Sequence, residues 1–394
     1  MTGDPLWLVD QKDAATRTID ASHAFDRTAA PGSALAPGPA LAPGSVANTF
    51  RLAGMQVAVL GAGAMGGTIA ALLHRAGHEV EITARGAQLV AIRDHGIRLG
   101  GAWGNHTAAV KAEARLTRRP GLAILATKAM DAPEAAAENA KLLDGVPLVV
   151  VQNGLGGLES VADAVPAATL IGALSLIAAS LVAPGEIVVT TAAATWLGMP
   201  GTDASGFRHS AAPARFAAEA LSTAIPCSVV DNFAGARWTK LIINQVNALP
   251  AITGLSVQDV VGHDGLRRLM TRSMREAARV GLARGIHFEE INGVTHGGLR
   301  ILAHAPLRFA EYLPVQLRAY LGDVPNPGST LQSIRRGQAS EIDYLNGAVV
   351  WAGTGTGVST RVNAGLVELV HEVERSWTFF TPDEVLKRFS RHAL

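Results

Sequence analysis

Hydrophobic positions along this chain change their period between its first and second halves. From Met55, the continuous apolar run MQVAVLG predicts a strand buried on both faces, and MGGTIAALLHRAG then places its apolar residues on one helical face. EVEITAR (79–85) predicts a second strand, and LAILATK and VPLVVVQNG predict two more on either side of a helix over APEAAAENAKLL (132–143). Further short strands are expected as far as Ala194. This alternation predicts a parallel, doubly wound α/β sheet.

The pattern becomes helical after about Asp231. KLIINQVNALPAI, LRRLMTRSMREAARVGLARGI and EIDYLNGAVVWAG repeat their apolar residues at helical spacing. We therefore expect a sheet-containing domain over residues 54–230 and an all-helical domain over 231–394. Residues 1–53 include AAPGSALAPGPALAPGS, which has no periodic apolar face, so they predict a disordered Ala/Pro/Gly-rich extension. A misplaced start, with Met55 as the true first residue, is the alternative.

Composition narrows the class of protein. The net charge is only +1 and the charges are dispersed, which argues against a nucleic-acid partner. The uncharged stretch between Asp163 and Glu186 is as long as the roughly 20 residues of a membrane-spanning helix, but proline and glycine interrupt it. Buried strands explain it better, and the N-terminus lacks the pattern of a secretory signal. We expect a soluble, cytoplasmic protein without membrane contact, and a homodimer is compatible with the sequence.

Metal and thiol chemistry find little support in the sequence. Cys227 is the single cysteine, so neither an intramolecular disulfide nor a thiolate metal cage is expected, and its favoured role is that of a small buried apolar residue. HEVER, which begins at His371, lacks the second histidine of a zinc-binding helix. We expect no metal site.

The glycines after the first strand carry the first chemical signal. Gly61, Ala62, Gly63, Ala64, Met65 and Gly66 fit the pattern G-x-G-x-x-G, with a strand before and a helix after. Such a turn lets a pyrophosphate approach the backbone at the positive end of a helix, which is the dinucleotide-binding arrangement of the Rossmann fold. A chance glycine cluster at a strand–helix turn is the alternative interpretation.

The residue that closes the second strand indicates which dinucleotide binds. An NAD site typically has an acidic residue about 20 residues after the glycines, where it holds the ribose hydroxyls. This chain has Arg85 there, and Glu81 comes too early in the strand. An arginine can hold the additional phosphate of NADP, which an acidic residue would repel. A solvated surface arginine is the alternative.

A second polar group lies on a predicted helix in the other half. Lys240, Asn244 and Asn247 are spaced at i, i+4 and i+7, so they share one face of a helix that is otherwise rich in Leu, Ile and Val. A lysine with two amides on such a stripe suits a polar cleft between domains. An amphipathic helix with a snorkelling lysine is the alternative.

With ARWTKLIINQVNALPAITG (from Ala236) and SEIDYLNG (Ser340 to Gly347) added to the glycine pattern, the chain resembles the ketopantoate reductases (2-dehydropantoate 2-reductases) of the 6-phosphogluconate dehydrogenase-like superfamily. The resemblance extends from Met55 to about Val373. It implies reduction of 2-dehydropantoate to pantoate with NADPH, on the route to pantothenate and coenzyme A. Hydride transfer would occur in a cleft between the two domains.

The resemblance also implies individual roles. Lys240 matches the lysine that donates a proton to the ketone oxygen, and Glu341 matches the glutamate that contacts cofactor and substrate hydroxyls. Asn244 and Asn247 lie on the substrate side. The remaining matches are Ser329 for the substrate carboxylate, Asn153 near nicotinamide and substrate, Lys128 on the cofactor side, Arg85 for the adenosine phosphate and Ala178 through its backbone near the cofactor.

Three departures from the family concern the substrate. The second asparagine of the lysine helix would fall at Ala248, with Asn247 one position early, and one residue turns a helical side chain by about 100°. Ser333 stands where an aspartate often follows the serine, and the segment after Gly254 lacks a further asparagine. These changes keep two other hypotheses open: a reductase of a different small 2-keto or hydroxy acid, and an NADP-binding sensor without catalysis.

Overall fold

A computed structural model describes residues 54–201, 210–322 and 324–390. The extension predicted for residues 1–53 lies outside these ranges.

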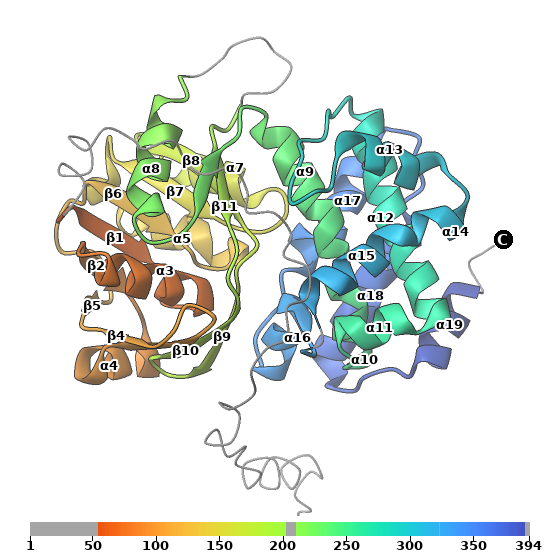
Figure 1. The fold of residues 1–394 in the computed structure, drawn as a ribbon, viewed down its shortest axis with the longest axis horizontal. Helices are drawn as coiled ribbons and strands as arrows, with labels where there is room; N and C mark the ends of the chain where they lie inside the picture. The colour runs from red at the N-terminus through yellow and green to blue at the C-terminus, as the bar shows by residue number, and fades with distance from the viewer. Residues whose placement is uncertain (1–53, 202–209, 323, 391–394) are drawn as a thin grey trace, which may run out of the picture. The chain divides into compact units, whose positions relative to one another are not determined.

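Eight strands form the main sheet, in the order β12-β11-β8-β7-β6-β1-β2-β5 (Figure 1). Neighbouring strands are parallel, apart from the antiparallel pair of β8 and β11. The strands are β1 (Gln56–Leu60), β2 (Glu79–Thr83), β5 (Lys111–Glu113), β6 (Leu122–Leu125), β7 (Pro147–Val151), β8 (Thr169–Ser175), β11 (Thr195–Gly198) and β12 (Cys227–Val229). The strand order runs in both directions from β1, as the alternating pattern predicts for a doubly wound sheet.

Alternate residues of the central strands face two separate cores. Val57 and Val59 of β1 belong to the core beneath α3 (Ala64–Arg75) and α8 (Ala212–Ser222). Ala58 and Leu60 face the opposite core, which contains α5 (Ala132–Ala137), α6 (Ala140–Leu143), α7 (Gly157–Ala164) and the C-terminal helices. Because both faces are covered, the strands are continuously apolar.

Four further strands form a second, smaller sheet that the hydrophobic pattern does not predict as a separate sheet. Its order is β4-β3-β10-β9, from β3 (Ile97–Gly101), β4 (His106–Ala108), β9 (Ala178–Ala183) and β10 (Glu186–Thr191). It packs on α3, and α4 (Gly86–His95) leads into it from β2. The uncharged run after Asp163 thus enters β8 and β9, and within the described ranges no helix has the length and apolarity needed to cross a membrane.

The helix predicted over 132–143 is interrupted in the structure. It divides into α5 and α6, with Glu138 and Asn139 between them. The Asn139 side chain donates to the carbonyl of Ala135 at 2.8 Å and accepts from the backbone of Leu116 at 2.8 Å. An asparagine that bonds locally to the backbone competes with regular helix, which explains the break.

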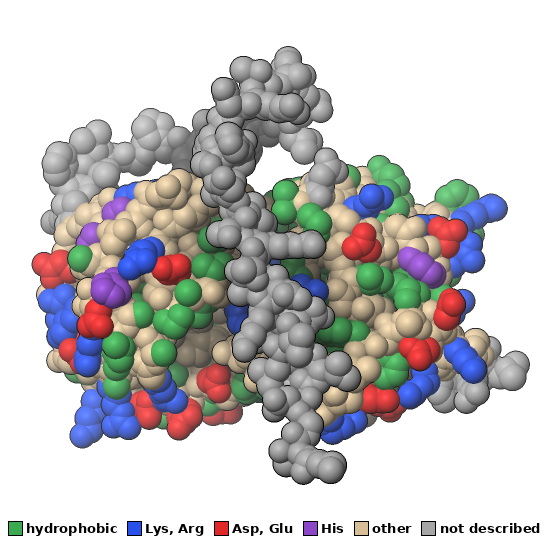
Figure 2. Space-filling model, turned by 90° about the horizontal axis from the view of Figure 1, so that it is seen from below, with side chains coloured by type: hydrophobic (Ala, Val, Ile, Leu, Met, Phe, Trp, Pro, Cys, Tyr) green, Lys and Arg blue, Asp and Glu red, His purple; other side chains and the backbone are tan. Residues whose placement is uncertain are grey.

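From Phe233 onward the named elements are helices, as the sequence predicts (Figure 1). They are α9 (Phe233–Asn244), the 3₁₀ turn η3 (Gln245–Asn247), α10 (Ala248–Thr253), α11 (Val257–Gly262), α12 (Asp264–Ala283), α13 (His296–His304), α14 (Leu307–Ala310), α15 (Tyr312–Leu321), α16 (Gly328–Arg335), the 3₁₀ turn η4 (Ile342–Tyr344), α17 (Asn346–Gly353), α18 (Arg361–Ser376) and α19 (Pro382–Ser390). Their apolar faces belong to the same buried cluster as one face of the main sheet, which places α9 beside the sheet. Figure 2 shows basic and acidic side chains interspersed on one outer face, in keeping with the low net charge.

Candidate active site

A cavity of about 870 Å³ is lined by residues from both the sheet-containing part and the helices. It brings together nearly all of the predicted site residues, although they are spread over most of the chain. These are Gly61, Ala62, Gly63, Ala64, Met65, Arg85, Lys128, Asn153, Ala178, Lys240, Asn244, Asn247, Ser329 and Glu341. Gly66 is the exception, because it lies behind the glycine loop, where a Cβ would come within 1.9 Å of the Gly61 oxygen.

The glycine loop joins β1 directly to α3, and its geometry requires glycine. Gly61 has φ +100°, and a Cβ there would come within 2.7 Å of the Thr127 side chain. A Cβ on Gly63 would meet no described heavy atom within 4 Å, so this residue faces open space. The Gly61 backbone N–H donates to the Thr83 hydroxyl at 3.0 Å, which ties the loop to the end of β2. The loop and the helix start fit a diphosphate placed at the N-terminus of α3.

Two cations line the cavity on the side of the sheet. Arg85 lies two residues after the end of β2 and directly before the first residue of α4; its side chain is 65% exposed. Lys128 follows β6, and its Nζ donates to the carbonyl of Ala339 at 2.6 Å, which joins the sheet edge to the segment before Glu341. Burial lowers the Lys128 pKa, and the nearby charge of Glu341 opposes that shift.

Lys240 projects from α9 into the cavity, where only 5% of the residue is exposed. Its Nζ donates to the carbonyl oxygen of Ser175 at the end of β8. Burial lowers the pKa of Lys240 to about 7, because removing an ammonium ion from water favours the neutral amine. A lysine in this state can exchange a proton near neutral pH.

The amides of α9 and η3 contact both sides of the cavity. Asn244 Nδ2 donates to Asn153 Oδ1 at 3.2 Å, and Asn247 Oδ1 accepts from the backbone N–H of Ser329 at 3.1 Å. The helix tightens to a 3₁₀ turn over 245–247, so the side chains advance by more than the α-helical angle per residue. Asn247 lines the cavity together with Lys240, as their i, i+7 spacing predicts, whereas Ala248 is fully buried.

Glu341 lies just before η4, with its carboxylate turned toward the sheet edge. Its Oε1 accepts from the backbone N–H of Ala129 at 3.0 Å. Burial raises the Glu341 pKa, while the Ala129 hydrogen bond and the charge of Lys128 act in the opposite direction. The carboxylate therefore sits among donors that hold its position.

Several residues that line the cavity belong to no recognisable motif of the sequence. Both polar atoms of the Gln152 side chain and the Thr127 hydroxyl are buried without a hydrogen-bond partner among the described residues. Gln152 directly precedes Asn153, and Thr127 directly precedes Lys128. Their positions at the ends of predicted strands are the feature of the sequence that could have identified them. Arg336 and Asn292 also line the cavity, from segments without a recognisable local pattern.

Two side chains outside the cavity show ordinary structural contacts. Cys227 is buried in β12, and burial raises the pKa of its thiol to about 12. His371 bonds to Glu374 at 2.8 Å and to Asp343 at 3.0 Å. In the part of the chain that the structure describes, no group of His, Cys, Asp and Glu side chains is arranged to hold a metal ion.

The fold and the glycine loop define a Rossmann-type protein with a helical C-terminal region. The family model for the ketopantoate reductase PanE/ApbA matches residues 57–201, and the model for the C-terminal part of the same family matches residues 232–374. The chain belongs to the ketopantoate reductase PanE/ApbA family.

Among its relatives, a 2-dehydropantoate 2-reductase of Mesorhizobium japonicum is 30% identical over 75% of this chain and 90% of the relative. The 2-dehydropantoate 2-reductase of Archaeoglobus fulgidus is 27% identical over 81% of this chain and 98% of its own length.

Solved structures show the same fold. The PanE/ApbA family ketopantoate reductase of Ralstonia eutropha JMP134 aligns with a TM-score of 0.68 at 26% identity, covering 82% of this chain and 99% of that one. A D-mandelate dehydrogenase solved with NADH and anilino(oxo)acetate aligns with a TM-score of 0.69 at 23% identity, over 82% of this chain and 99% of its own.

Proposed function

We propose that this protein reduces 2-dehydropantoate (ketopantoate) to pantoate with NADPH, and that Lys240 donates the proton. The observation that carries the proposal is the buried ammonium group of Lys240 in the same cavity as the glycine loop. Membership of the family and the names of the relatives support the substrate. The division into a nucleotide-binding domain (54–230) and a catalytic domain (231–394) belongs to the same proposal.

The chemistry divides between the cofactor and the protein. Bound NADPH would supply the hydride for the ketone carbon. Lys240 then protonates the ketone oxygen as that oxygen gains negative charge, and the amine is left neutral. A pKa of about 7 lets Lys240 release its proton to an alkoxide and regain one from water between turnovers. The Ser175 carbonyl fixes the direction of the Nζ group.

The other cavity residues orient the reactants. Ser329 would hold the substrate carboxylate, with its backbone fixed by Asn247. Asn153 and Asn244, hydrogen-bonded to one another, would position the nicotinamide and the substrate. Glu341 would accept hydrogen bonds from hydroxyl groups, since its carboxylate is already anchored to Ala129.

Different residues of the cavity would contact successive parts of the cofactor. The glycine loop and the start of α3 would bind the diphosphate, Lys128 and the backbone of Ala178 would contact the nicotinamide half, and Arg85 would bind the adenosine phosphate. A nicotinamide dinucleotide fits because the Gly63 side of the loop is open.

An NADPH-oxidation assay with a panel of keto acids tests this function. Ketopantoate should give the highest kcat/KM, ahead of pyruvate and branched 2-keto acids. If another keto acid is turned over faster, the second candidate holds, namely a reductase of a different 2-keto acid. Ser333 in place of an aspartate and Ala248 in place of an asparagine favour that candidate, and the D-mandelate dehydrogenase shares the fold. NADPH binding without turnover of any keto acid would indicate a sensor.

A further inference from the structure

A second, smaller cavity of about 230 Å³ continues from the glycine loop toward the end of β2. Gly61 and Ala62 line it on one side, and Arg85, Glu138 and Asn139 line it on the other. In a Rossmann-type site, the adenosine half of the dinucleotide lies between the glycine loop and the end of the second strand. This cavity is therefore the place where the adenine ribose and its 2′ substituent would lie.

Glu138 bridges two arginines, of which Arg85 also lines this cavity. Its Oε2 accepts from Arg85 Nη2 at 2.9 Å, and its Oε1 accepts from Arg115 Nη2 at 3.1 Å. The arginine side chains are 65% and 66% exposed, whereas that of Glu138 is 23% exposed. Burial opposes ionisation of Glu138, but the hydrogen bonds from Arg115 and Arg85 prevail and lower its pKa. Glu138 is thus an anion at neutral pH.

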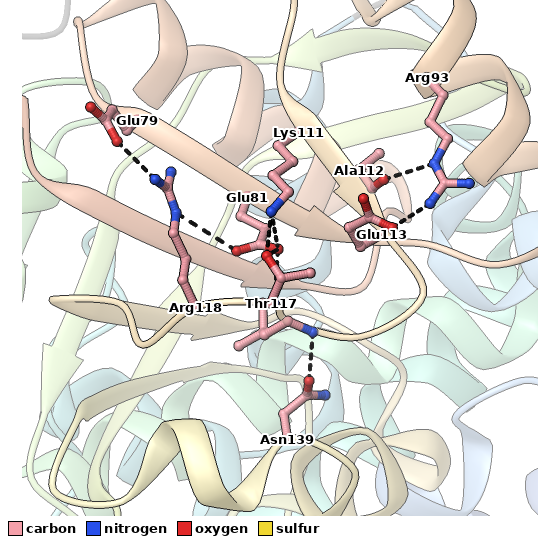
Figure 3. A network of polar contacts seen from close by, with 10 residues as sticks. Glu79, Glu81, Arg93, Lys111, Ala112, Glu113, Thr117, Arg118 and Asn139 are labelled. Carbon is pink, nitrogen blue, oxygen red and sulfur yellow. Dashed lines mark hydrogen bonds and ion pairs between the residues drawn. The ribbon is translucent and has the colours of Figure 1, made fainter.

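Hydrogen bonds to Asn139 and Glu81 hold the loop that follows Arg115 (Figure 3). The backbone N–H of Leu116 donates to Asn139 Oδ1 at 2.8 Å, which ties the loop after Arg115 to the residue after Glu138. On the other side, the N–H and hydroxyl of Thr117 donate to Glu81 Oε1 at 3.0 and 2.7 Å. Glu81 is 2% exposed and has Lys111 and Arg118 as partners. The loop that carries Arg115 is therefore anchored at two successive residues.

A carboxylate and a phosphate compete for the same guanidinium donors. Both accept paired N–H groups, and a guanidinium that is bonded to one anion has fewer donors free for another. The two ribose hydroxyls of NADH can instead donate to a carboxylate, as they do to the acidic residue of typical NAD sites. Glu138 thus weakens the binding of NADPH and strengthens the binding of NADH. Arg85 and Arg115 have the opposite effect.

We infer that Glu138 sets the selectivity of this site between NADPH and NADH, because its carboxylate occupies guanidinium donors of Arg85 and Arg115 that a 2′-phosphate would otherwise use. This inference rests on the proposed function, since it concerns the same nucleotide site. The inference assigns Arg115 as a second phosphate-binding cation. Because of Glu138, the preference for NADPH over NADH should be smaller than Arg85 alone would produce.

Titration calorimetry of the full-length protein with NADPH and with NADH tests the inference without any turnover. In Glu138→Gln, NADPH should bind roughly tenfold or more tightly relative to NADH, the size expected for one charge-assisted hydrogen bond. Glu134→Gln is the matched control, because Glu134 is an exposed acidic residue of α5 outside both cavities, and it should leave the ratio unchanged. Competition by 2′,5′-ADP and by 5′-AMP should show the same shift.

Arg115→Ala provides an independent variant in case Glu138→Gln does not fold. It should weaken NADPH roughly tenfold and change NADH by less than about twofold. A ratio that stays within about twofold of wild type in Glu138→Gln, or equal weakening of both cofactors in Arg115→Ala, would overturn the inference. If the wild-type protein binds neither dinucleotide, it is the proposed function that fails.

Discussion

The backbone N–H of Ala129 donates to the carboxylate of Glu341 at 3.0 Å, although the two residues are 212 positions apart. Next to this bond, Lys128 Nζ donates to the carbonyl of Ala339 at 2.6 Å. The glutamate of the helical part is therefore held in position by the loop after β6. A substitution that breaks one of these two hydrogen bonds should therefore shift the Glu341 carboxylate and lower activity, even when the other cavity residues are unchanged.

Two substitutions of Glu341 should separate the effect of its hydrogen bond to Ala129 from the effect of its negative charge. Glu341→Gln keeps an oxygen that can accept from Ala129, and we expect kcat/KM to fall roughly tenfold. Glu341→Ala removes both acceptor oxygens, and we expect a loss of about 100-fold, since a hydrogen bond to a charged group contributes about 1.5–3 kcal/mol. Steady-state kinetics with ketopantoate measure both. Equal activity of the Ala and Gln variants would show that the Ala129 bond does not matter.

Replacing Lys240 should lower activity and raise stability together. Lys240→Met removes the proton donor, so turnover should fall by about 10²–10⁴-fold while NADPH binding stays nearly intact. The free energy of unfolding should increase, on the order of a few kcal/mol at pH 7, because a buried ammonium group is costly. Urea unfolding and calorimetry measure the two effects. Near-normal turnover would rule out Lys240 as the acid.

The stability gain from Lys240→Met should depend on pH. In the unfolded chain a lysine has a pKa of about 10.4, whereas folding lowers that of Lys240 to about 7. Below pH 7 both states hold the proton, and the buried charge has its full cost. Between pH 7 and 10.4 only the unfolded state holds it, so wild-type stability increases with pH. The difference between variant and wild type should therefore shrink as pH rises, and a constant difference would contradict the assigned pKa.

The two directions of the reaction should have opposite pH profiles. Reduction needs protonated Lys240, so its kcat/KM should be level below pH 7 and fall by up to tenfold per unit above it. Oxidation of pantoate needs the neutral amine and should rise through the same pH. Lys240→Arg provides the control. Because an arginine stays charged, the change of rate with pH near 7 should disappear in this variant. If reduction and oxidation both rose, or both fell, through pH 7, Lys240 would be excluded as the group that transfers the proton.

Asn247 should matter for the substrate and hardly for the cofactor. Asn247→Ala removes the acceptor for the Ser329 N–H, so we expect KM for the keto acid to rise roughly tenfold, with NADPH affinity within about twofold. Asn247→Asp keeps the acceptor oxygen but adds a negative charge beside the proposed carboxylate site, so KM should rise further than in Asn247→Ala. Parallel kinetic and calorimetric titrations check this. A larger effect on NADPH than on the keto acid would place Asn247 elsewhere in the mechanism.

Much of the nucleotide half of the site could be predicted from local sequence. The apolar run before Gly61 and the helical stripe after it specify a strand, a turn and a helix through contacts between near neighbours. Helical spacing alone predicts that Lys240, Asn244 and Asn247 share one face, and the structure brings all three to the cavity. The roles of Glu341 and Ser329 are implied only by the family resemblance, since no spacing links these residues to the glycines.

Asn247 shows where local rules stop. Helical spacing and family matching disagreed by one residue between Asn247 and Ala248. The structure has Asn247 lining the cavity and Ala248 fully buried, in agreement with the helical spacing. What the spacing does not predict is the 3₁₀ geometry of residues 245–247, which pack against α16 from a distant part of the chain.

By itself, the sequence determined the alternation of strands and helices around the glycine turn and the helical character of the second half. Only the tertiary structure decided the second sheet, in which β3 pairs with β10 from 88 residues away, and the meeting of Arg85 and Arg115 at Glu138. The reason is physical. Turns and helical faces follow from neighbouring residues, whereas strand pairing and ion pairs between distant segments depend on which surfaces the packed core brings together.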